Sequence, residues 1–483
     1  RFVQHFPPFE LVSHDKVEYN CFIMDIQLPK SVLDILDKFD KVGHEIYIVG
    51  GAVRDILMGR ITNDWDFTTN ATPEEILKII PGGLYNNQFG TVFTDNPDDP
   101  ARPHEITTFR KEEGYTDARH PDKITWGKSL KEDLARRDFT INAIALQFPI
   151  SNFQFPNKSQ NPNFQIIDPY GGEKDIKAKL IRAVGDPDER FGEDALRMMR
   201  AVRIGAEIGF LIEDTTFEAI KKNAPLINKI AKERVKEELF KILASPNPYD
   251  GIVLFRNAGL MQEILPEMEK CFGVEQKSPG RHHIYDVGNH LLMSLKNCKS
   301  SDPVTRFATL IHDIGKAQTY RKLESGVITF YNHEMVSTKI AENIADRLRF
   351  SNKERDKFIK LIRWHQFTVD EHQTDSAIRR ILRNVGLEYM NDMLALRVAD
   401  RLGGGARETS WRLEEFKTRL IEVQKQPFSI TDLKINGNDV MKELNLKPGP
   451  DVGKILNDLF DKVVEKKIEN EKESLLKELG KLG

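Results

Sequence analysis

The sequence predicts an α+β protein in which a unit with a sheet comes first and a nearly all-helical chain follows. Short β-type runs such as EIYIV and DWDFTT alternate with helical pieces between residues 25 and 150, which is typical of helices packed on a sheet. After Lys174 the pattern becomes helical almost throughout. The Asn- and Pro-rich stretch from Phe153 to Phe164 reads as a long surface loop that separates the two parts.

Length and composition narrow the class of protein. At roughly 150 residues per domain, 483 residues predict about three domains. With 40% hydrophobic and 30% charged residues the chain is neither disordered nor fibrous. The 71 basic and 74 acidic residues leave a net charge of -3, which excludes a basic nucleic-acid coat of the histone kind but leaves room for a local basic groove.

The sequence indicates a cytoplasmic protein. No window holds the eighteen or more apolar residues that a membrane span needs. The first residues, RFVQHFPPFELVSHD, lack the basic-then-apolar pattern of a secretory signal. Cys21, Cys271 and Cys298 have neither metal nor disulfide spacing, which favours a reducing compartment.

Proline and glycine mark further joints in the helical part, at Pro246 and Pro248, at Pro279-Gly280 and at Gly403 to Gly405. With the long loop, these joints predict four parts. The predicted parts are residues 25–150, 165–275, 276–410 and 411–483.

The first candidate site begins with a strand, a glycine turn and a helix. Glu45 to Val49 reads as a buried strand, Gly50-Gly51 allows a tight turn, and Ala52 to Met58 reads as a helix. Such a turn can present backbone N–H groups to phosphate, and Arg54 adds a charge-assisted donor. A glycine pair alone also fits an ordinary turn.

Two carboxylates follow on what reads as the next strand. The period of two over Asn63-Asp64-Trp65-Asp66-Phe67 places Asp64 and Asp66 on one face and the two aromatic rings on the other. Converging carboxylates repel unless a cation lies between them, and their oxygens suit Mg²⁺. A solvated strand face is the alternative, but the glycine turn about ten residues earlier favours phosphoryl transfer.

These residues carry a resemblance to a known family. IVGGAVRDILMGR with NDWDFTTNATPEE resembles the head of class II tRNA nucleotidyltransferases and bacterial poly(A) polymerases, and the match continues through LARRDFTINAIAL, IIDPYGGEKDI and GEDALRMMRAVR. It implies a nucleotidyltransferase-fold head with a mixed sheet over residues 25–150. It also implies that Asp64 and Asp66 hold two Mg²⁺ ions, which activate the primer 3′-hydroxyl and neutralise the triphosphate. Glu105 is either a third ligand or a support.

The second family motif contains Arg136, Arg137, Asp138 and Asn142, and in the family it contacts ribose and triphosphate. Asp138 and Asn142 are four apart and can share a helical face. An arginine pair on a solvated helix is the alternative. The full set of nucleotide-binding residues implied is Gly50, Gly51, Arg54, Arg137, Asp138, Asn142, Asp194, Arg197, Arg200 and Arg203.

A third motif offers a way to choose bases without a template. Asp194 and Arg197 are three apart in a helical run and should be neighbours on one face. Cytosine and adenine each place an amino donor beside a ring-nitrogen acceptor, which a carboxylate and a guanidinium match; uracil and guanine reverse that order. This agrees with the templating role of the Glu193-Asp194-x-x-Arg197 motif in the family, where Arg234 and Glu237 match the bracing motif. A surface salt bridge is the alternative.

The third predicted part carries metal chemistry of its own. Seven of the twelve histidines lie between residues 282 and 372, and FATLIHDIGKA places a His-Asp pair in an apolar helix, where charge is costly unless it is paired or bound to metal. The pattern resembles the HD superfamily of metal-dependent phosphohydrolases in its six-ligand form, with a divalent transition metal. The alternative is a purely structural HD domain. The ligands implied are His290, His312, Asp313, His333, His365 and Asp400.

The resemblance implies a complete reaction. Residues 165–275 would form a helical neck that carries the templating helix, 276–410 the HD domain, and 411–483 a tRNA-binding tail in which Pro448-Gly449-Pro450 opens a helix. The enzyme would add C, C and A to the 3′ end of tRNA from CTP and ATP. The alternatives are a bacterial poly(A) polymerase, an A-adding enzyme, or an HD-type RNA-end phosphodiesterase with a non-catalytic head.

The segment that links the first two motifs bears on these alternatives. The residues Arg110, Tyr115, Asp117, Arg119 and Pro121 match a loop that relatives limited to CC addition tend to lack, which favours CCA or A addition. The insert TDNPDDPARP just before it departs from the usual family pattern.

Overall fold

The structure is a computed structural model, and its chain divides into two compact units. The first comprises residues up to 114, from 122 to 178 and from 182 to 185; the second comprises the remaining residues. The four predicted parts stay a prediction beside this coarser division. The described residues are 28–86, 90–113, 123–127, 129–148, 164–276, 284–367, 374–407, 411–424, 430–465 and 467–481.

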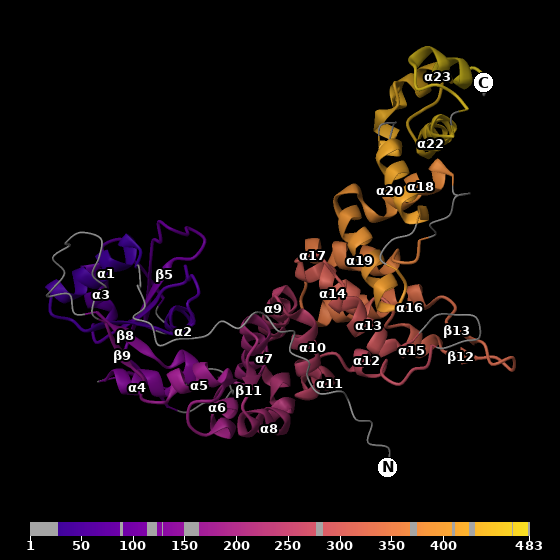
Figure 1. Ribbon diagram of the computed structural model, residues 1–483. Helices are drawn as coiled ribbons and strands as arrows, with labels where there is room; N and C mark the ends of the chain where they lie inside the picture. The colour runs from indigo at the N-terminus through magenta and orange to yellow at the C-terminus, as the bar shows by residue number, and fades with distance from the viewer. Residues whose placement is uncertain are drawn as a thin grey trace. The chain divides into compact units, whose positions relative to one another are not determined.

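The first unit is built on a seven-stranded mixed sheet with the order β3-β4-β5-β2-β1-β8-β9 (Figure 1). The β2–β5 pair is parallel, and the other neighbours in this sheet are antiparallel. The mixed-sheet head predicted from the sequence is confirmed. The strands are β1 (Ile46–Val49), β2 (Asp66–Thr69), β3 (Leu84–Asn86), β4 (Thr91–Thr94), β5 (His104–Thr108), β8 (Ala145–Gln147) and β9 (Gln165–Ile167).

Alternation along β1 divides the hydrophobic core of this unit between the two faces of the sheet. Ile46 and Ile48 pack into a large cluster with residues of helices α1, α2 and α3. Tyr47 and Val49 pack into a second cluster that includes residues of α4. This is the period of two expected of a strand covered on both faces. The helices and the remaining hairpin are α1 (Lys30–Lys41), α2 (Gly51–Leu57), α3 (Pro73–Ile79), α4 (Leu130–Ala135), α5 (Gly172–Ala178), the 3₁₀ turn Thr140–Asn142, and strands β6 (Arg110–Glu113) and β7 (Lys123–Trp126).

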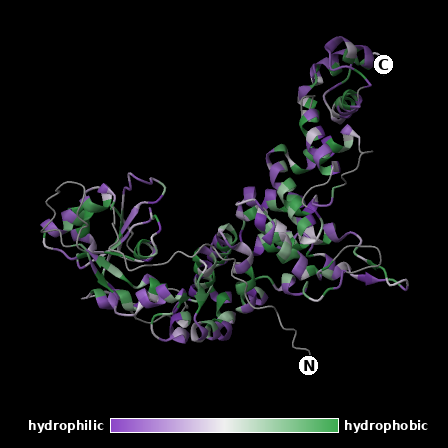
Figure 2. Ribbon diagram, in the orientation of Figure 1, coloured by the Kyte–Doolittle hydropathy of each residue, from purple (hydrophilic) through white to green (hydrophobic). Residues whose placement is uncertain are grey.

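The second unit is nearly all helical, as the sequence predicts. Its helices carry both polar and apolar stretches in Figure 2, as amphipathic helices do. Two short strand pairs interrupt them: β10 (Leu180–Ile181) with β11 (Leu211–Ile212), and β12 (Arg321–Lys322) with β13 (Ile328–Thr329). The helices are α6 (Pro187–Glu193), α7 (Leu196–Ile208), α8 (Asp214–Asn223), α9 (Lys232–Ala244), α10 (Pro248–Asn257), α11 (Leu260–Ile264), α12 (Pro266–Glu269), α13 (Val287–Lys296), α14 (Pro303–Ile311), α15 (Lys316–Thr319), α16 (His333–Arg347), α17 (Asn352–Arg363), α18 (Asp375–Val385), α19 (Met390–Gly403), α20 (Trp411–Gln424), α21 (Gly437–Glu443), α22 (Pro450–Val464) and α23 (Lys472–Leu479), with 3₁₀ turns at Ala224–Lys229, Leu387–Tyr389 and Ile430–Asp432.

The C-terminal helices form a small core of their own and are fastened to α18. Helix α22 begins at Pro450 after Gly449, as Pro448-Gly449-Pro450 predicts. The fully buried Arg379 of α18 donates from Nη1 to the carbonyl oxygen of Val464, the last residue of α22, over 2.7 Å. A guanidinium thus satisfies a carbonyl at the helix end, which has no partner within the helix. Across the described residues, no helix is both long enough and apolar enough to cross a membrane.

Candidate functional site

The glycine turn after β1 brings a carboxylate and a guanidinium together. Gly50 has φ +77°, and a Cβ added there would lie 3.1 Å from Asp66 Oδ2 and 3.2 Å from Arg137 Nη1. Glycine is therefore required for its conformation and for the space that the two side chains occupy. Gly51 opens helix α2, and a Cβ there would lie 3.6 Å from a nitrogen of Arg54.

The two aspartates lie on the same face, as the alternation predicts. Trp65 and Phe67 are buried, whereas Asp64 is exposed and Asp66 half-buried. The predicted strand is too long at its start, because β2 begins at Asp66 and the residues before it form no ladder. In the parallel β2–β5 ladder Asp66 pairs with Glu105, which places that third carboxylate on the same edge of the sheet.

The negative charge at this edge of the sheet affects the pKa of Glu105. Loss of solvent around its carboxyl, and then the negative charge of Asp64, raise the pKa of Glu105. Mutual repulsion of this kind is what a divalent cation relieves. The oxygens of Asp64, Asp66 and Glu105 are not among the groups of potential ligands whose donor atoms lie within 4.8 Å of one another in the described part of the chain.

Arg54, Asn142 and Asp138 form a chain of buried hydrogen bonds. Arg54 donates from Nη1 to Asn142 Oδ1 over 3.1 Å and from Nε to Asp55 over 3.0 Å. Asn142 donates from Nδ2 to Asp138 Oδ1 over 3.2 Å. The expected contact between Asp138 and Asn142 is present, but the prediction that they share a face of a helix is wrong. The two residues meet across a turn, because α4 ends at Ala135 and Asn142 closes a single 3₁₀ turn.

The two arginines of the second motif share one buried acid. Arg136 donates to Asp133 Oδ1 over 2.6 Å, and Arg137 donates to Asp133 Oδ2 over 3.3 Å. Burial alone would raise the pKa of Asp133, but the two guanidinium groups outweigh burial and hold that pKa below its usual value. The sequence reading missed Asp133, although its spacing of three and four residues from an arginine pair is a signal for it. The alternative of a solvated arginine pair is therefore wrong.

The templating motif lies in the second unit, at a break between two helices. Asp194 caps the end of α6 in an extended conformation, and α7 begins at Leu196. The predicted single helical run is therefore wrong. Arg197 donates to Glu193 Oε2 over 2.5 Å and to the carbonyl oxygen of Arg190 over 3.2 Å. Asp194 instead lies 3.5 Å from Arg234, the arginine expected to brace it.

The buried acid of α9 is Glu238, the neighbour of Glu237, which is the residue that matches the family's bracing motif. Glu237 is exposed, whereas Glu238 is 4% exposed and lies 2.9 Å from Arg203 Nε and 3.1 Å from Lys241. The signal was in the sequence, because position 238 falls within the buried apolar stripe of α9. Arg203 also pairs with Glu207 over 3.1 Å, and Arg200 lies half-buried on the same helix, α7.

The structure brings the six predicted HD residues together in two groups that share Asp313. The first group contains His290 of α13, His312, Asp313 and Asp400 of α19. His290 Nε2 lies 3.2 Å from Asp400 Oδ1 and 3.4 Å from Asp313 Oδ2. His312 Nε2 lies 3.4 Å from Asp313 Oδ2 and 3.5 Å from Asp400 Oδ1. Two carboxylates and two imidazoles at these distances form a four-ligand set for a transition metal.

The second group contains Asp313, His333 and His365. His333 Nε2 lies 3.1 Å and His365 Nε2 3.3 Å from Asp313 Oδ1, the other oxygen of the shared carboxylate. His333 opens α16, and His365 lies just after α17. Asp313 would therefore offer one carboxylate oxygen to each group of potential metal ligands.

Hydrogen bonds to the backbone orient three of the imidazoles. Nδ1 of His312, His333 and His365 lies 2.7–2.8 Å from the carbonyl oxygens of Thr309, Phe330 and Ile362. A carbonyl only accepts, so each Nδ1 carries the proton, the arrangement of metal-binding histidines. Their Nε2 atoms are buried and have no hydrogen-bond partner in the described part of the chain. Each Nε2 therefore needs its own proton or a cation between it and the carboxylate.

The pKa shifts in this cluster show that imidazoles and carboxylates stabilise one another's charge. Burial alone would lower the pKa of His312, but the carboxylates of Asp313 and Asp400 outweigh burial and raise that pKa to about 10. Burial would raise the pKa of Asp313 and Asp400, but neighbouring positive charges hold both well below the usual range. A metal ion bound here would take the place of the imidazole protons, because only neutral imidazole binds a metal.

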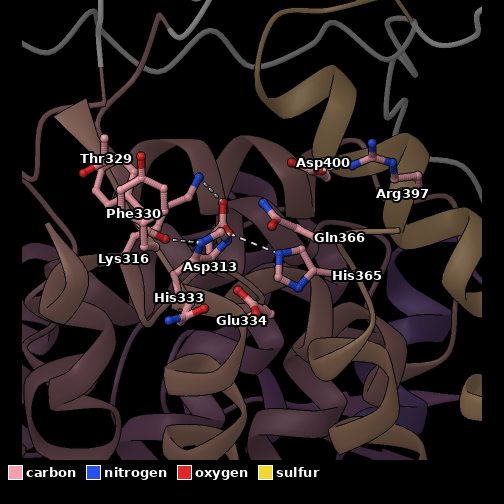
Figure 3. A pocket seen from close by; sticks show the side chains of 12 residues that line it. Asp313, Lys316, Thr329, Phe330, His333, Glu334, His365, Gln366, Arg397 and Asp400 are labelled. Carbon is pink, nitrogen blue, oxygen red and sulfur yellow. Dashed lines mark hydrogen bonds and ion pairs between the residues drawn. The ribbon is translucent and has the colours of Figure 1, made fainter. Parts of the chain in front are cut away.

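A cavity of about 390 Å³ opens on the second group. Its lining includes Asp313, His333, His365 and Asp400 but neither His290 nor His312. In Figure 3 the Asp313 carboxylate lies between Lys316 and His365. Lys316 is buried, 2.6 Å from Asp313 Oδ2, and also donates to Gln276 over 2.8 Å.

Several predicted residues lie outside the described part of the chain. In the linking loop this holds for Tyr115, Asp117, Arg119 and Pro121, whereas Arg110 opens strand β6.

Family models match three successive parts of the chain, and curated relatives match almost all of it. The family described as poly A polymerase head domain matches residues 46–182, that described as "probable RNA and SrmB-binding site of polymerase A" matches 209–272, and that described as "tRNA nucleotidyltransferase domain 2 putative" matches 325–479. The CCA-adding enzyme of Ligilactobacillus salivarius is 34% identical over 454 residues, which cover 94% of this chain and 96% of the relative. That of Lactococcus lactis subsp. lactis is 32% identical over 449 residues, 93% of this chain and 96% of the relative.

Solved structures agree in fold. The Bacillus stearothermophilus CCA-adding enzyme in complex with CTP superimposes with a TM-score of 0.69 at 28% identity, covering 93% of this chain and 96% of the other. The Thermotoga maritima CCA-adding enzyme complexed with tRNA superimposes with a TM-score of 0.58 at 19% identity, covering 94% and 97%. The second likeness is one of fold alone.

Proposed function

Because this chain belongs to the CCA-adding enzyme family of tRNA nucleotidyltransferases, we propose that it adds C, C and A in turn to the 3′ end of tRNA. The substrates are CTP and ATP, and no nucleic-acid template is used. The observation that carries the proposal is the turn at Gly50, where the Asp66 carboxylate and the Arg137 guanidinium meet at the end of a buried strand. A carboxylate to hold metal and a guanidinium to hold phosphate are the parts that nucleotidyl transfer needs.

The residues of the head fit a magnesium site. The carboxylate set is hard and anionic, burial and then the charge of Asp64 raise the pKa of Glu105, and the space beside Asp66 is kept open by Gly50. Mg²⁺ held by Asp64 and Asp66 would acidify the primer 3′-hydroxyl and neutralise the triphosphate. The sheet fixes Asp66, Arg137 donates to phosphate, and the Asp138–Asn142 pair faces the ribose.

Base choice is assigned to Asp194 and Arg197. Asp194 accepts from the exocyclic amino group of cytosine or adenine, and Arg197 donates to the neighbouring ring nitrogen. Glu193 keeps Arg197 in one orientation, and Arg234 does the same for Asp194. Uracil and guanine would place a donor against the guanidinium and a carbonyl against the carboxylate, so they are rejected.

An end-labelling experiment tests this function. The protein is incubated with tRNA transcripts that lack CCA, CA or A, together with each labelled nucleotide. The proposal predicts two C residues and then a single A. A ladder of A residues would instead indicate a poly(A) polymerase, A on the CC-ended transcript alone an A-adding enzyme, and shortening of the 3′ end the phosphodiesterase alternative.

A second activity is supported by the HD cluster. Four donors converge in the first group and three in the group that opens on the cavity, and the buried Nε2 atoms of His312, His333 and His365 lie 3.1–3.4 Å from the oxygens of Asp313. These residues fit two divalent transition metals, which would supply an activated water for attack on a phosphoester. A site closed by four protein ligands holds metal tightly, whereas three ligands leave a position open. We therefore assign the phosphoester to the cavity side.

Metal analysis and a phosphatase assay test this second activity separately. The purified protein should contain manganese, zinc, iron, cobalt or nickel in stoichiometric amount, and Asp313→Ala should remove most of it. Hydrolysis of a chromogenic phosphoester should follow the metal content and be unaffected by Asp66→Asn. A wild-type protein that binds none of these metals would leave the structural alternative.

A further inference from the structure

The insert that departs from the family pattern is organised around one buried side chain. It joins β4 to β5 over residues 95–103, and its Asn96 is 3% exposed. The Asn96 amide donates to the carbonyl oxygen of Arg102 over 2.8 Å and to that of Asn63 over 3.3 Å. Its Oδ1 accepts from the backbone N–H groups of Asp98 and Asp99 over 3.1 and 3.2 Å. All four bonds go to backbone, so Asn96 fixes the course of two chain segments.

One of these bonds reaches the residue directly before Asp64. Residues 60–65 belong to no strand, and the Asp64 carboxylate is exposed beside Glu105, which repels it. Other hydrogen bonds of this stretch include Asp64 N–H to Thr62 Oγ1 over 3.3 Å, Thr62 Oγ1 to the carbonyl oxygen of Asp64 over 3.4 Å, and Glu105 N–H to the carbonyl oxygen of Trp65 over 3.4 Å. The bond from Asn96 fixes the peptide group between Asn63 and Asp64.

The loop can serve as an anchor because it is itself held in place. Ala101 N–H donates to Asp99 Oδ1 over 3.2 Å, and Arg102 N–H donates to the carbonyl oxygen of Asp99 over 2.9 Å. Ser31 of α1 donates to Asp98 Oδ2 over 2.7 Å, which ties the outer side of the loop to the body of the unit.

We propose that Asn96 is a positioning residue for Asp64, so that the insert serves the nucleotidyl-transfer site. The inference rests on the proposed role of Asp64 as a magnesium ligand. Mg²⁺ demands near-ideal octahedral geometry with short bonds, so a ligand on an irregular segment needs its backbone fixed. Loss of an outer partner of a metal ligand typically weakens metal binding tenfold or more. Asn96 acts in this way through the backbone of Asn63.

Asn96→Asp is the sharpest test, because aspartate keeps the acceptor for Asp98 and Asp99 and loses both donated bonds. We expect the Mg²⁺ concentration for half-maximal CTP incorporation to rise about tenfold, with kcat reduced and KM for tRNA unchanged. Amide hydrogen exchange over residues 62–66 should also be faster than in wild type, while exchange in α1 is unchanged. Ser31→Ala, which removes the loop's bond to α1 while Asn96 keeps its bond to Asn63, is the matched control and should shift the Mg²⁺ midpoint much less than Asn96→Asp does.

Other outcomes would overturn the inference. If Asn96→Asp lowers Tm but leaves both the Mg²⁺ midpoint and exchange at 62–66 unchanged, Asn96 is merely structural. Asn96→Ala is the second variant, and both are compared at a temperature at which circular dichroism shows native helix content. Asp64→Asn separates the two proposals. If it stays active, the proposed role of Asp64 fails; if it is inactive while Asn96→Asp keeps the wild-type Mg²⁺ midpoint, the positioning role alone fails.

Discussion

The ammonium group of Lys316 lies 2.6 Å from Oδ2 of Asp313, the carboxylate that both HD groups share. Both side chains are buried, so the cation, together with the imidazoles around Asp313, compensates a negative charge that is costly in the interior. The ammonium therefore does part of what a bound metal would do for Asp313.

This pairing predicts a metal-dependent stability effect. Lys316→Met should destabilise the metal-free protein by about 3–5 kcal/mol, the usual cost of removing one partner from a buried ion pair. Addition of Mn²⁺ or Zn²⁺ should recover most of the loss, because the metal then compensates Asp313. Thermal unfolding with and without chelator measures both values. An equal loss with and without metal would contradict the prediction.

Gly50 predicts a loss of activity out of proportion to the loss of stability. Gly50→Ala forces a side chain to positive φ, at about 1–3 kcal/mol, and pushes Asp66 and Arg137 apart. A misplacement on the order of 1 Å costs about a hundredfold in rate. Gly59→Ala is the matched control, because Gly59 has φ +68° and nothing within 4 Å of an added Cβ. If both variants lose activity equally in single-turnover assays, strain rather than displacement is the cause.

Arg197 predicts relaxed base choice with retained chemistry. Without its guanidinium the donor for the ring nitrogen of cytosine and adenine is lost, so discrimination against UTP should fall about ten- to hundredfold. Ratios of kcat/KM for CTP, ATP, UTP and GTP measure this directly. Asp66→Asn should instead abolish addition of every nucleotide. An Arg197→Ala enzyme that still adds C and A alone would rule out the templating role.

Substitutions at the neighbouring residues Glu237 and Glu238 should differ in their effect on stability. Glu238→Gln leaves Arg203 and Lys241 without their buried carboxylate and should lower the free energy of unfolding by about 1–3 kcal/mol. Glu237→Gln changes an exposed side chain and should stay within about 0.5 kcal/mol of wild type. Urea unfolding compares the two. Equal effects would show that the pairing in α9 contributes nothing to stability.

Local patterns predicted the parts of the candidate site that depend on the chain's own geometry. The period of two from Asp64 to Phe67 and the turn at Gly50 follow from strand geometry and from the conformational freedom of glycine. The six HD residues are spread from His290 to Asp400, and beyond the His-Asp pair a family resemblance rather than a local pattern pointed to them.

The features that the sequence analysis missed depend on where helices end and on contacts between segments far apart in the sequence. Helical spacing suggested that Asp194 and Arg197 share a face, yet Asp194 leaves the helix and Glu193 becomes the partner of Arg197. No local sequence pattern points to Asn96, because its role depends on a hydrogen bond to a carbonyl oxygen 33 positions away in the chain. Tertiary contacts of this kind override local propensity.

The buried bond from Arg379 to the end of α22 limits how this architecture can change in evolution. A lineage that shed its last helices would remove the Val464 carbonyl that accepts from this guanidinium. Selection to keep an arginine at position 379 would then be weaker. Among homologues of different length, we expect an arginine at this position to accompany the C-terminal segment and an uncharged residue to mark its loss.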